Sequence, residues 1–497
     1  MRKLFCTLAL LVGCTIMAWA GKVDRPKLVV GIVVDQMRWD YLHYYYEQYG
    51  EGGLKRLLND GFSCDNTMIS YVPTVTAIGH SCVYTGSVPA FTGIAGNNFM
   101  LNGRNVTSVT DTTVYAVGSD KENKDGKCSP RNLLANTIGD QLKIATDFKA
   151  KVIGVALKDR ASILPAGHAA DAAYWWDTKA GHFITSNYYM EQLPRWMDNF
   201  NRIHHTEPGF DIKTSTKGVT MTFKMAEEII TRERLGKHEQ TDMIAVSISS
   251  TDAIGHAYST RGKENHDVYM QLDKDLTHFL RTLDQEVGRG NYLLFLTADH
   301  GAVHNGNFLN SHKLPGGGFS GSQTSAGLDK YLGQKFGKEG KYIKTVMDCR
   351  FYLDHDFLKA NGIDAQAVKK EAIKWLKQDP QFAFVVDYED VNNQSVPQFL
   401  RERIINGYHR LRSGDFMIVL QGSHMHGTVG PNYKGTSHGT WNPDDSHIPL
   451  IFMGWHVKQG STSTPTYMTD IAATVCAMLH IQMPDCCIGN AIQEVWK

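Results

Sequence analysis

Three carboxylates and three imidazoles in this chain have the types and spacing of metal ligands. In Asp252-Ala-Ile-Gly-His256 the two outer residues lie four positions apart, so one helical turn or a tight loop can bring both to one ion. Asp299 and His300 are adjacent, and neighbouring side chains can converge where a strand has ended. The full set is Asp35, Asp252, His256, Asp299, His300 and His438. Six such ligands suit a pair of ions, which can stabilise both the attacking and the leaving oxygen of an in-line displacement.

The ligand types favour zinc, since oxygen and nitrogen ligands without thiolates are typical of catalytic zinc sites. They do not exclude manganese or iron. Each residue also has an ordinary structural explanation. Asp35 could cap a helix that begins near Met37, and Asp252 could equally be a helix N-cap. A single Asp-x-x-x-His pattern is common by chance, so the metal hypothesis depends on the combined set.

The segment Pro73-Thr74-Val75-Thr76 supplies a candidate nucleophile. A threonine at the start of a helix lies where backbone N–H groups and the helix dipole favour an anion. This position helps an alkoxide to form near a metal and helps to bind a phosphoryl group. Thr74 and Thr76 are equally suited to a plain N-cap role, so the residues alone do not choose between them.

Apolar, β-branched runs alternate with helical patterns along the chain and predict an α/β fold. We expect a mostly parallel central sheet with helices on both faces, and ligands beyond the carboxyl ends of its strands. The predicted strands are Lys27–Val34, Lys151–Leu157, Met243–Ile248, Tyr292–Thr297, Phe416–Leu420 and Ile448–Met453, and the predicted helices are Arg131–Thr146, Met225–Leu235, Asn265–Val287 and Tyr467–Leu479. Charge-capable residues recur at the strand ends: Asp35, Lys158, Arg160, Asp252, Asp299 and His300.

Two stretches interrupt the alternation, near residues 167–218 and 301–433. We interpret both as insertions that cap or flank the site within one catalytic domain, residues 21–497. An alternative is that the second stretch, with helices near Ala365–Gln378 and Val396–His409, forms a separate accessory domain.

The N-terminus has the features of an export signal. A charged start, an apolar run and Ala18-Trp19-Ala20 predict a signal peptide over residues 1–20, and hence a periplasmic or secreted protein. A less favoured alternative is lipoprotein anchoring at Cys14. No other segment qualifies as a membrane span. Seven cysteines remain after cleavage, so disulfides are plausible, and the odd number leaves at least one of them without a partner in the chain.

Composition limits the classes of partner. The 497 residues include 51 basic and 51 acidic side chains, so no broad positive field exists for nucleic acid or a polybasic membrane surface. We expect small-molecule substrates and favour a monomer, although the sequence leaves the oligomeric state open.

The chain resembles the alkaline phosphatase superfamily, in particular its nucleotide pyrophosphatase/phosphodiesterase-like branch and, within it, the PafA-type alkaline phosphatases. The resemblance covers almost the whole mature chain. Its motifs are Pro-Thr-x-Thr at 73–76, Gly93-Ile-Ala-Gly96-Asn97, Asp252-x-x-x-His256, Asp299-His300-Gly301 and Ser437-His438-Gly439.

The resemblance implies two Zn²⁺ ions and a role for each motif. Thr76, rather than Thr74, would be the nucleophile and form a phosphothreonine intermediate, and Asn97 would bind phosphate. One zinc would be held by Asp252, His256 and His438, and the other by Asp35, Asp299, His300 and the Thr76 oxygen.

Lys158 and Arg160 favour monoesters among the phosphate esters. PafA-type members carry a lysine and an arginine here, which diesterases of the branch generally lack. A monoester carries about two negative charges near neutral pH and needs more cationic help than a diester with one. The pair could also be a solvated charge cluster after a strand. A phosphodiesterase or nucleotide pyrophosphatase, and a non-catalytic zinc-dependent binding protein, are the two alternative functions.

Overall fold

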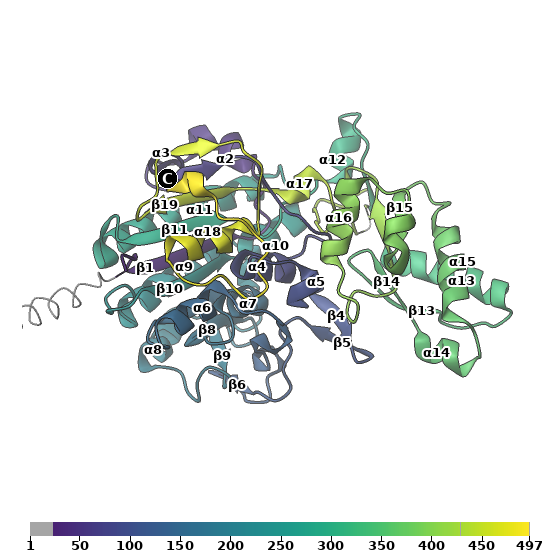
Figure 1. The fold of residues 1–497 in the computed structure, drawn as a ribbon, viewed down its shortest axis with the longest axis horizontal. Helices are drawn as coiled ribbons and strands as arrows, with labels where there is room; N and C mark the ends of the chain where they lie inside the picture. Colours follow the sequence, from purple (N-terminus) through teal and green to yellow (C-terminus); the bar gives the residue numbers. More distant parts are fainter. Residues whose placement is uncertain (1–22, 428, 497) are drawn as a thin grey trace, which may run out of the picture.

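A computed structural model describes residues 23–427 and 429–496. The predicted signal peptide and Cys14 lie outside the described residues. The main sheet consists of β1 (Leu28–Val34), β2 (Phe62–Cys64), β6 (Ala116–Val117), β7 (Val152–Ala156), β8 (Ala172–Asp177), β9 (His182–Ser186), β10 (Asp242–Ile248), β11 (Tyr292–Thr297), β19 (Leu450–Gly454) and β20 (Gly460–Thr462). Its order is β20-β2-β19-β11-β1-β10-β7-β8-β9-β6 (Figure 1).

The centre of this sheet is parallel. Strand β1 pairs in parallel with β10 and β11, β10 pairs with β7, and β7 with β8. Every residue of β1 is buried, as expected for an apolar strand covered on both faces. The predicted α/β class is therefore confirmed.

Helices cover both faces of the sheet (Figure 1). Helices α4, α6, α7 and α18 pack together on one face, and α3, α9 and α11 on the other. The bounds of the helices around the main sheet are α2 (Tyr41–Tyr44), α3 (Leu54–Asp60), α4 (Thr76–Thr85), α5 (Pro89–Thr92), α6 (Ile138–Ala145), α7 (Asp159–Ala166), α8 (Arg195–Ile203), α9 (Lys217–Arg232), α10 (Ser250–Tyr258), α11 (Lys263–Leu283), α17 (Pro443–Ser446) and α18 (Asp470–Met478).

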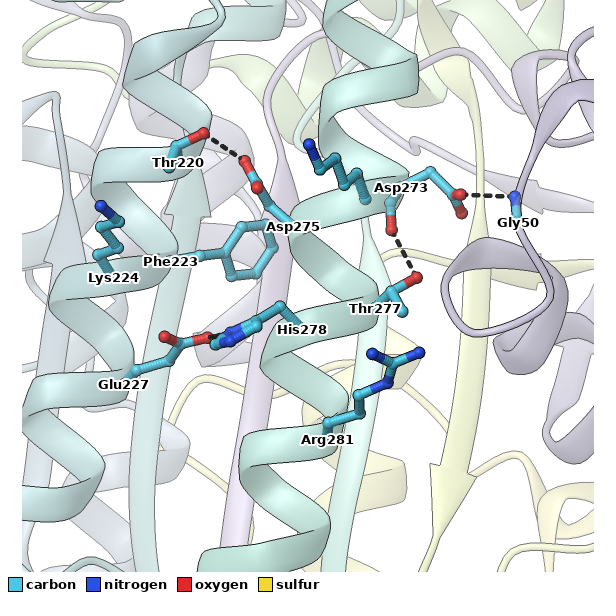
Figure 2. Close-up of a pocket in the computed structure, with 11 residues that line it drawn as sticks. Gly50, Thr220, Phe223, Lys224, Glu227, Asp273, Asp275, Thr277, His278 and Arg281 are labelled. Carbon is cyan, nitrogen blue, oxygen red and sulfur yellow. Dashed lines mark hydrogen bonds and ion pairs between the residues drawn. The ribbon is translucent and has the colours of Figure 1, made fainter.

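Polar contacts fix the helices of the second face to one another. Helices α9 and α11 line a crevice of ≈ 500 Å³ (Figure 2). Across it Thr220 donates a hydrogen bond of 2.6 Å to Asp275. Asp273 accepts hydrogen bonds from the backbone N–H groups of Gly50 and Leu54, both at 2.7 Å, and so holds the start of α3. The three helices therefore form one layer behind the sheet.

A smaller body extends from one end of the sheet and has its own core (Figure 1, right). We call residues 306–426 the accessory lobe. An antiparallel sheet in the order β13-β14-β16-β15 lies at its centre, and the Phe351 and Phe416 rings stack there at 5.0 Å. Its elements are α12 (Gly306–Ser311), β12 (Gly317–Phe319), α13 (Gly321–Phe336), β13 (Ile343–Met347), β14 (Arg350–Leu353), α14 (His355–Ala360), α15 (Ala365–Leu376), β15 (Phe382–Asp387), α16 (Gln398–Gly407), β16 (Phe416–Leu420) and β17 (His424–His426).

The segment 167–218 lies at the edge of the main sheet. Its strand β8 continues the parallel order beside β7, and β9 turns back antiparallel to β8. The remaining short strands are β3 (Thr67–Met68), β18 (His447–Ile448) and β21 (Thr466–Tyr467), which form one small sheet, and the hairpin β4 (Asn98–Leu101) and β5 (Arg104–Thr107).

Two predicted strands are placed differently in the structure. The prediction for Phe416–Leu420 was wrong about its sheet, because β16 belongs to the accessory lobe. The run Ile448–Met453 is split between β18 and β19, and β19 pairs antiparallel with β11. A buried apolar run indicates a covered strand, but it carries no information on direction or on which sheet the strand joins.

The predicted helix Arg131–Thr146 begins later than expected, at Ile138. A capping box fixes this start, because Thr137 and Asp140 exchange side-chain and backbone hydrogen bonds at the N-terminus of α6. Residues Pro130–Asn132 form a separate 3₁₀ turn. The apolar periodicity continued through both pieces and concealed the boundary.

Among the described residues no helix is both long and apolar enough to cross a membrane. All seven cysteines in the described part of the chain are free thiols.

Candidate metal and phosphate site

The structure gathers the six predicted ligands into two groups beyond the carboxyl ends of β1, β10 and β11. Within each group one ligand atom per residue lies within 4.8 Å of the others. The first group is Asp252, His256 and His438, and the second is Asp35, Asp299 and His300.

In the first group, Asp252 and His256 occupy successive turns of α10. Asp252 Oδ1 lies 3.1 Å from Nε2 of His256 and 3.6 Å from Nε2 of His438. The Nδ1 atoms face carbonyl oxygens, at 2.9 Å for His256 with Thr436 and 2.7 Å for His438 with Thr74. A carbonyl only accepts, so each Nδ1 carries the proton. Both Nε2 lone pairs therefore face Asp252, as metal ligation requires.

The second group contains three buried atoms without a hydrogen-bond partner in the described structure. These atoms are Asp35 Oδ1, Asp299 Oδ2 and His300 Nε2, of which Asp299 Oδ2 also lies 3.2 Å from Nδ1 of His80. The other oxygen of Asp299 accepts the backbone N–H groups of Gln36 at 3.1 Å and of His300 at 3.0 Å. A buried polar atom left unpaired costs about 1–3 kcal/mol. Three such atoms close to one another fit a site for a cation, which all three could bind.

The balance of buried charges also favours a bound cation. Burial raises the pKa of Asp35 to about 8, and the nearby Asp299 adds to the effect. Burial opposes ionisation of Asp252 as well, but the charge of the neighbouring Lys158 holds the pKa of Asp252 well below the usual range. Three buried carboxylates thus share one ammonium group. Divalent cations would supply the missing positive charge.

The two groups lie side by side. The His300 and His438 rings stack with centroids 3.6 Å apart. Lys158 Nζ lies 2.6 Å from Oδ2 of Asp35 and 2.6 Å from Oδ2 of Asp252, so it contacts one carboxylate of each group. Burial and the neighbouring His300 lower the pKa of His438 well below its usual value. His438 is therefore neutral, the form that binds metals.

Thr76 is the first residue of α4 and is 1% exposed. The N-cap position belongs to Val75, and no side chain caps this helix. The alternative that Thr76 is a plain N-cap is therefore wrong. Its hydroxyl instead accepts a long hydrogen bond of 3.4 Å from Lys158 Nζ.

The other two predicted phosphate contacts differ in how closely they approach Thr76. Asn97 Oδ1 accepts the backbone N–H of Ala77 at 2.9 Å, which fixes Asn97 against the first turn of α4. Arg160 lies in the first turn of α7, with Asp159 as its ion-pair partner at 3.6 Å. No described hydrogen bond joins Arg160 to Thr76 or Lys158, although its charge acts on the Lys158 ammonium. Arg160 Nε is buried without a hydrogen-bond partner in the described part of the chain.

Residues around the site that the sequence did not indicate hold its loops together. Asp445 accepts hydrogen bonds from the backbone N–H of Thr440 at 2.6 Å, from its hydroxyl at 2.7 Å and from the Thr74 hydroxyl at 3.3 Å. His80 bonds through Nδ1 to the Thr76 carbonyl at 2.9 Å. The only sequence signal for these was the four-residue spacing of His80 from Thr76. Asp445 follows Asp444 in the short helix α17, and no sequence pattern marks it.

Two arginines of the accessory lobe hold the loop that carries Asn97. Arg350 is fully buried and donates to the carbonyl of Ala95. Arg412 donates to the Gly93 carbonyl at 2.5 Å and lies over the ring of Phe99 at 4.9 Å. The lobe therefore contacts the loop of the predicted phosphate site through arginine side chains that bind main-chain carbonyl groups of that loop.

The family model of type I phosphodiesterase/nucleotide pyrophosphatase matches residues 29–440. The chain belongs to this family. The resemblance found in the sequence is thereby confirmed.

Known proteins are similar to this chain along nearly their whole length. The alkaline phosphatase PafA of Elizabethkingia meningoseptica is 41% identical, over 95% of this chain and 95% of that protein. A Myroides odoratus protein named calcium-transporting ATPase is 45% identical over the same shares. A crystal structure of wild-type PafA matches with a TM-score of 0.92 and 41% identity, over 96% of this chain and 100% of that chain.

Proposed function

We propose that this chain is a zinc-dependent alkaline phosphatase that hydrolyses phosphate monoesters with Thr76 as nucleophile. Relatives named alkaline phosphatases, 41% and 42% identical over most of the chain, support the activity. The observation that carries the proposal is the position of the Thr76 hydroxyl. It is free of any capping role, lies at the N-terminus of α4, and is next to the Lys158 ammonium that joins both ligand groups.

The residues present fit two zinc ions. One would be held by Asp252, His256 and His438, and the other by Asp35, Asp299, His300 and the Thr76 oxygen. When bound, zinc would act as a Lewis acid that stabilises negative charge on the attacking and leaving oxygens.

The chain's own groups account for substrate binding. The backbone N–H groups at the start of α4 attract the phosphoryl group, and the Asn97 amide donates to it. In this proposal Lys158 and Arg160 would bind the nonbridging oxygens, Lys158 as a point charge and Arg160 through its planar fork. Two cations suit the dianionic monoester better than a diester, which has one charge.

The reaction we propose is a double displacement. The Thr76 hydroxyl loses its proton to solvent, and Oγ1 forms a bond to phosphorus while the bond from phosphorus to the leaving oxygen breaks. The Lys158 ammonium, 3.4 Å from Oγ1, stabilises the alkoxide. Water then attacks the phosphothreonine, and its oxygen bonds to phosphorus as the bond to Oγ1 breaks, which restores Thr76 and releases phosphate. Catalysis rests on positioning and charge stabilisation.

The test is Thr76→Ala in the zinc-loaded protein, with an aryl phosphate monoester as substrate. We expect kcat/KM to fall by roughly 10³-fold or more, since the covalent route is lost. Wild-type protein quenched in acid during turnover is expected to show one added phosphoryl group on Thr76 by mass spectrometry. Near-wild-type activity of Thr76→Ala contradicts the assignment. Thr85→Ala is the matched control, because Thr85 is a buried threonine at the other end of the same helix.

We also propose export to the periplasm or the medium, with cleavage after Ala20, and a monomeric mature protein. Cell fractionation, N-terminal sequencing and light scattering on the purified protein test these three points. An N-terminus at a lipidated Cys14 is the outcome that contradicts the cleavage site.

A further inference from the structure

Gln36, the residue after the ligand Asp35, contacts both ligand groups. Its side-chain Nε2 donates a hydrogen bond of 2.6 Å to Oδ1 of Asp252, in the first group. Its backbone N–H donates to Oδ1 of Asp299, in the second group, at 3.1 Å. Gln36 is 3% exposed. One buried residue therefore holds a carboxylate of each group.

The backbone of Gln36 adopts an unfavourable conformation. Its φ is 64°, in the left-handed region that a residue with a side chain adopts at a cost of about 1–2 kcal/mol. A glycine would take this conformation without strain and would present the same backbone N–H to Asp299. The contact to Asp299 therefore does not explain a glutamine here. The remaining explanation is the side-chain contact to Asp252.

Helix α10 leaves room for the Gln36 side chain by having a glycine, which is itself unfavourable within a helix. Gly255 lies inside α10, between Asp252 and His256, and a glycine within a helix is about 1 kcal/mol less favourable than alanine. A Cβ at position 255 would lie 1.9 Å from Oε1 of Gln36. Gly255 thus provides the space in which the Gln36 amide reaches Asp252. Gln36 and Gly255 are both locally unfavourable, and both are needed for the hydrogen bond from Gln36 to Asp252.

The contact is made to the oxygen that faces the imidazoles. Asp252 Oδ1 lies 3.1 Å from Nε2 of His256, whereas Oδ2 accepts from Lys158 at 2.6 Å. A carboxylate oxygen has two lone pairs, so Oδ1 can accept from Gln36 and still face the histidines. The hydrogen bond from Gln36 to Oδ1 therefore opposes rotation of the carboxylate toward Lys158.

We infer that Gln36 is a positioning residue for the first metal group, with its amide fixing the orientation of Asp252 toward a cation shared with His256 and His438. The inference rests on the proposed metal-dependent function and adds a residue to it. Hydrogen-bond partners that orient metal ligands typically change metal affinity by 10–100-fold when removed.

The test is zinc affinity, measured by titrating the zinc-loaded protein with a chromophoric chelator. Gln36→Gly keeps the backbone N–H and relieves the strain but removes the amide. We expect one of the two zinc ions to bind at least about 10-fold more weakly, while the other is retained. Two zinc ions bound with wild-type affinity in Gln36→Gly overturn the inference. A wild-type protein that binds no zinc instead contradicts the proposed function, so the two failures are distinguishable.

Two further variants support the measurement. Gly255→Ala displaces the Gln36 amide from the other side, and we expect it to weaken the same zinc ion and to alter the visible spectrum of the cobalt-substituted protein in the same way. Asn102→Gly is the matched control, because Asn102 also has a positive φ of 50° but lies in the exposed β4–β5 turn. We expect it to keep wild-type zinc affinity. Loss of affinity in Asn102→Gly, or an unchanged cobalt spectrum in Gly255→Ala, contradicts the inference.

Discussion

The main-chain carbonyl of Thr74 accepts a hydrogen bond of 2.7 Å from Nδ1 of His438. This contact joins two loops that are 364 residues apart in the sequence. One loop leads into the helix that begins with Thr76, and the other carries His438, the last proposed ligand of the first group. The Thr74 hydroxyl strengthens the junction, since it donates to the Thr440 carbonyl at 3.0 Å. The proposed nucleophile and the proposed metal ligands are thereby held as one unit.

Removing the Lys158 ammonium is expected to affect monoesters more than diesters. A hydrogen bond to a charged group contributes about 1.5–3 kcal/mol, so Lys158→Ala should lower monoester kcat/KM by roughly 10- to 150-fold. Paired assays with an aryl phosphate and an aryl phosphodiester measure the difference. Strong diester preference in the wild type, unharmed by Lys158→Ala, favours a phosphodiesterase instead. Lys143→Ala is the control, because Lys143 is a buried lysine that pairs with a carboxylate, Asp171, away from the site.

The accessory lobe should act on catalysis through Arg412. Arg412→Gln leaves the Gly93 and Asn132 carbonyls without their buried donor, at about 1–3 kcal/mol each. We expect a lower free energy of unfolding and a lower kcat/KM, because the loop that carries Asn97 loosens. In an Asn97→Ala background the kinetic effect should shrink, since the two residues act in series. If the effects of Arg412→Gln and Asn97→Ala on kcat/KM are fully additive in the double variant, the prediction is contradicted.

Lys369→Gln is the matched control for Arg412→Gln. Lys369 is a cation with a buried side chain in the same lobe, and it pairs with Asp387 at 3.0 Å and Glu389 at 2.7 Å. We expect it to lower stability without changing kcat/KM.

Metal removal should lower stability as well as activity. A ligand that binds only the folded state at about 1,000 times its Kd contributes about 4 kcal/mol. Chelation is therefore expected to lower the melting temperature and abolish phosphatase activity, and added zinc should restore both. Phosphatase activity that remains after complete chelation contradicts the proposed metal dependence. A melting temperature unchanged by chelation contradicts the role of the six ligands.

His304 should contribute to acid sensitivity. Burial and the nearby Arg38 lower the pKa of His304 to about 4, whereas the unfolded value is 6.5. Its neutral form is favoured by folding, so this stability is fully present above pH 6.5 and is lost as pH falls toward 4. The loss is at most about 3 kcal/mol. Denaturant unfolding at pH 7.5 and pH 4.5 should show a smaller decrease in His304→Gln than in wild type, whereas the exposed His278→Gln should behave like wild type.

Much of the fold could be predicted because the parallel strands are buried on both faces. The runs that became β1, β7, β10 and β11 differ from their predicted bounds by at most one residue at each end. Direction and sheet membership could not be predicted for β16 and β19, since both depend on pairing across a long insertion. The late start of α6 depends on Thr137 and Asp140, whose capping box lies inside an otherwise continuous helical pattern.

The candidate site was predictable to the extent that its residues follow strand ends. Asp35 comes directly after β1, and Asp299 and His300 follow β11 after Ala298, where the topology of a parallel sheet brings them together. Gln36 and Asp445 could not be found in this way. Their roles come from hydrogen bonds to residues 216 and 371 positions away, which no local pattern encodes.

The two strands that flank the segment containing the accessory lobe, β11 and β19, are neighbours in the main sheet. The chain leaves β11 at Thr297 and re-enters at Leu450 of β19, and these two residues pair directly across the sheet. The gap that the intervening chain must span is therefore one strand spacing, about 5 Å, however many residues lie between. Doubling such a loop adds only about 0.6 kcal/mol of closure entropy. Insertions and deletions within the lobe can thus accumulate in evolution without stretching the sheet, provided that Arg350 and Arg412 keep their hold on the Asn97 loop.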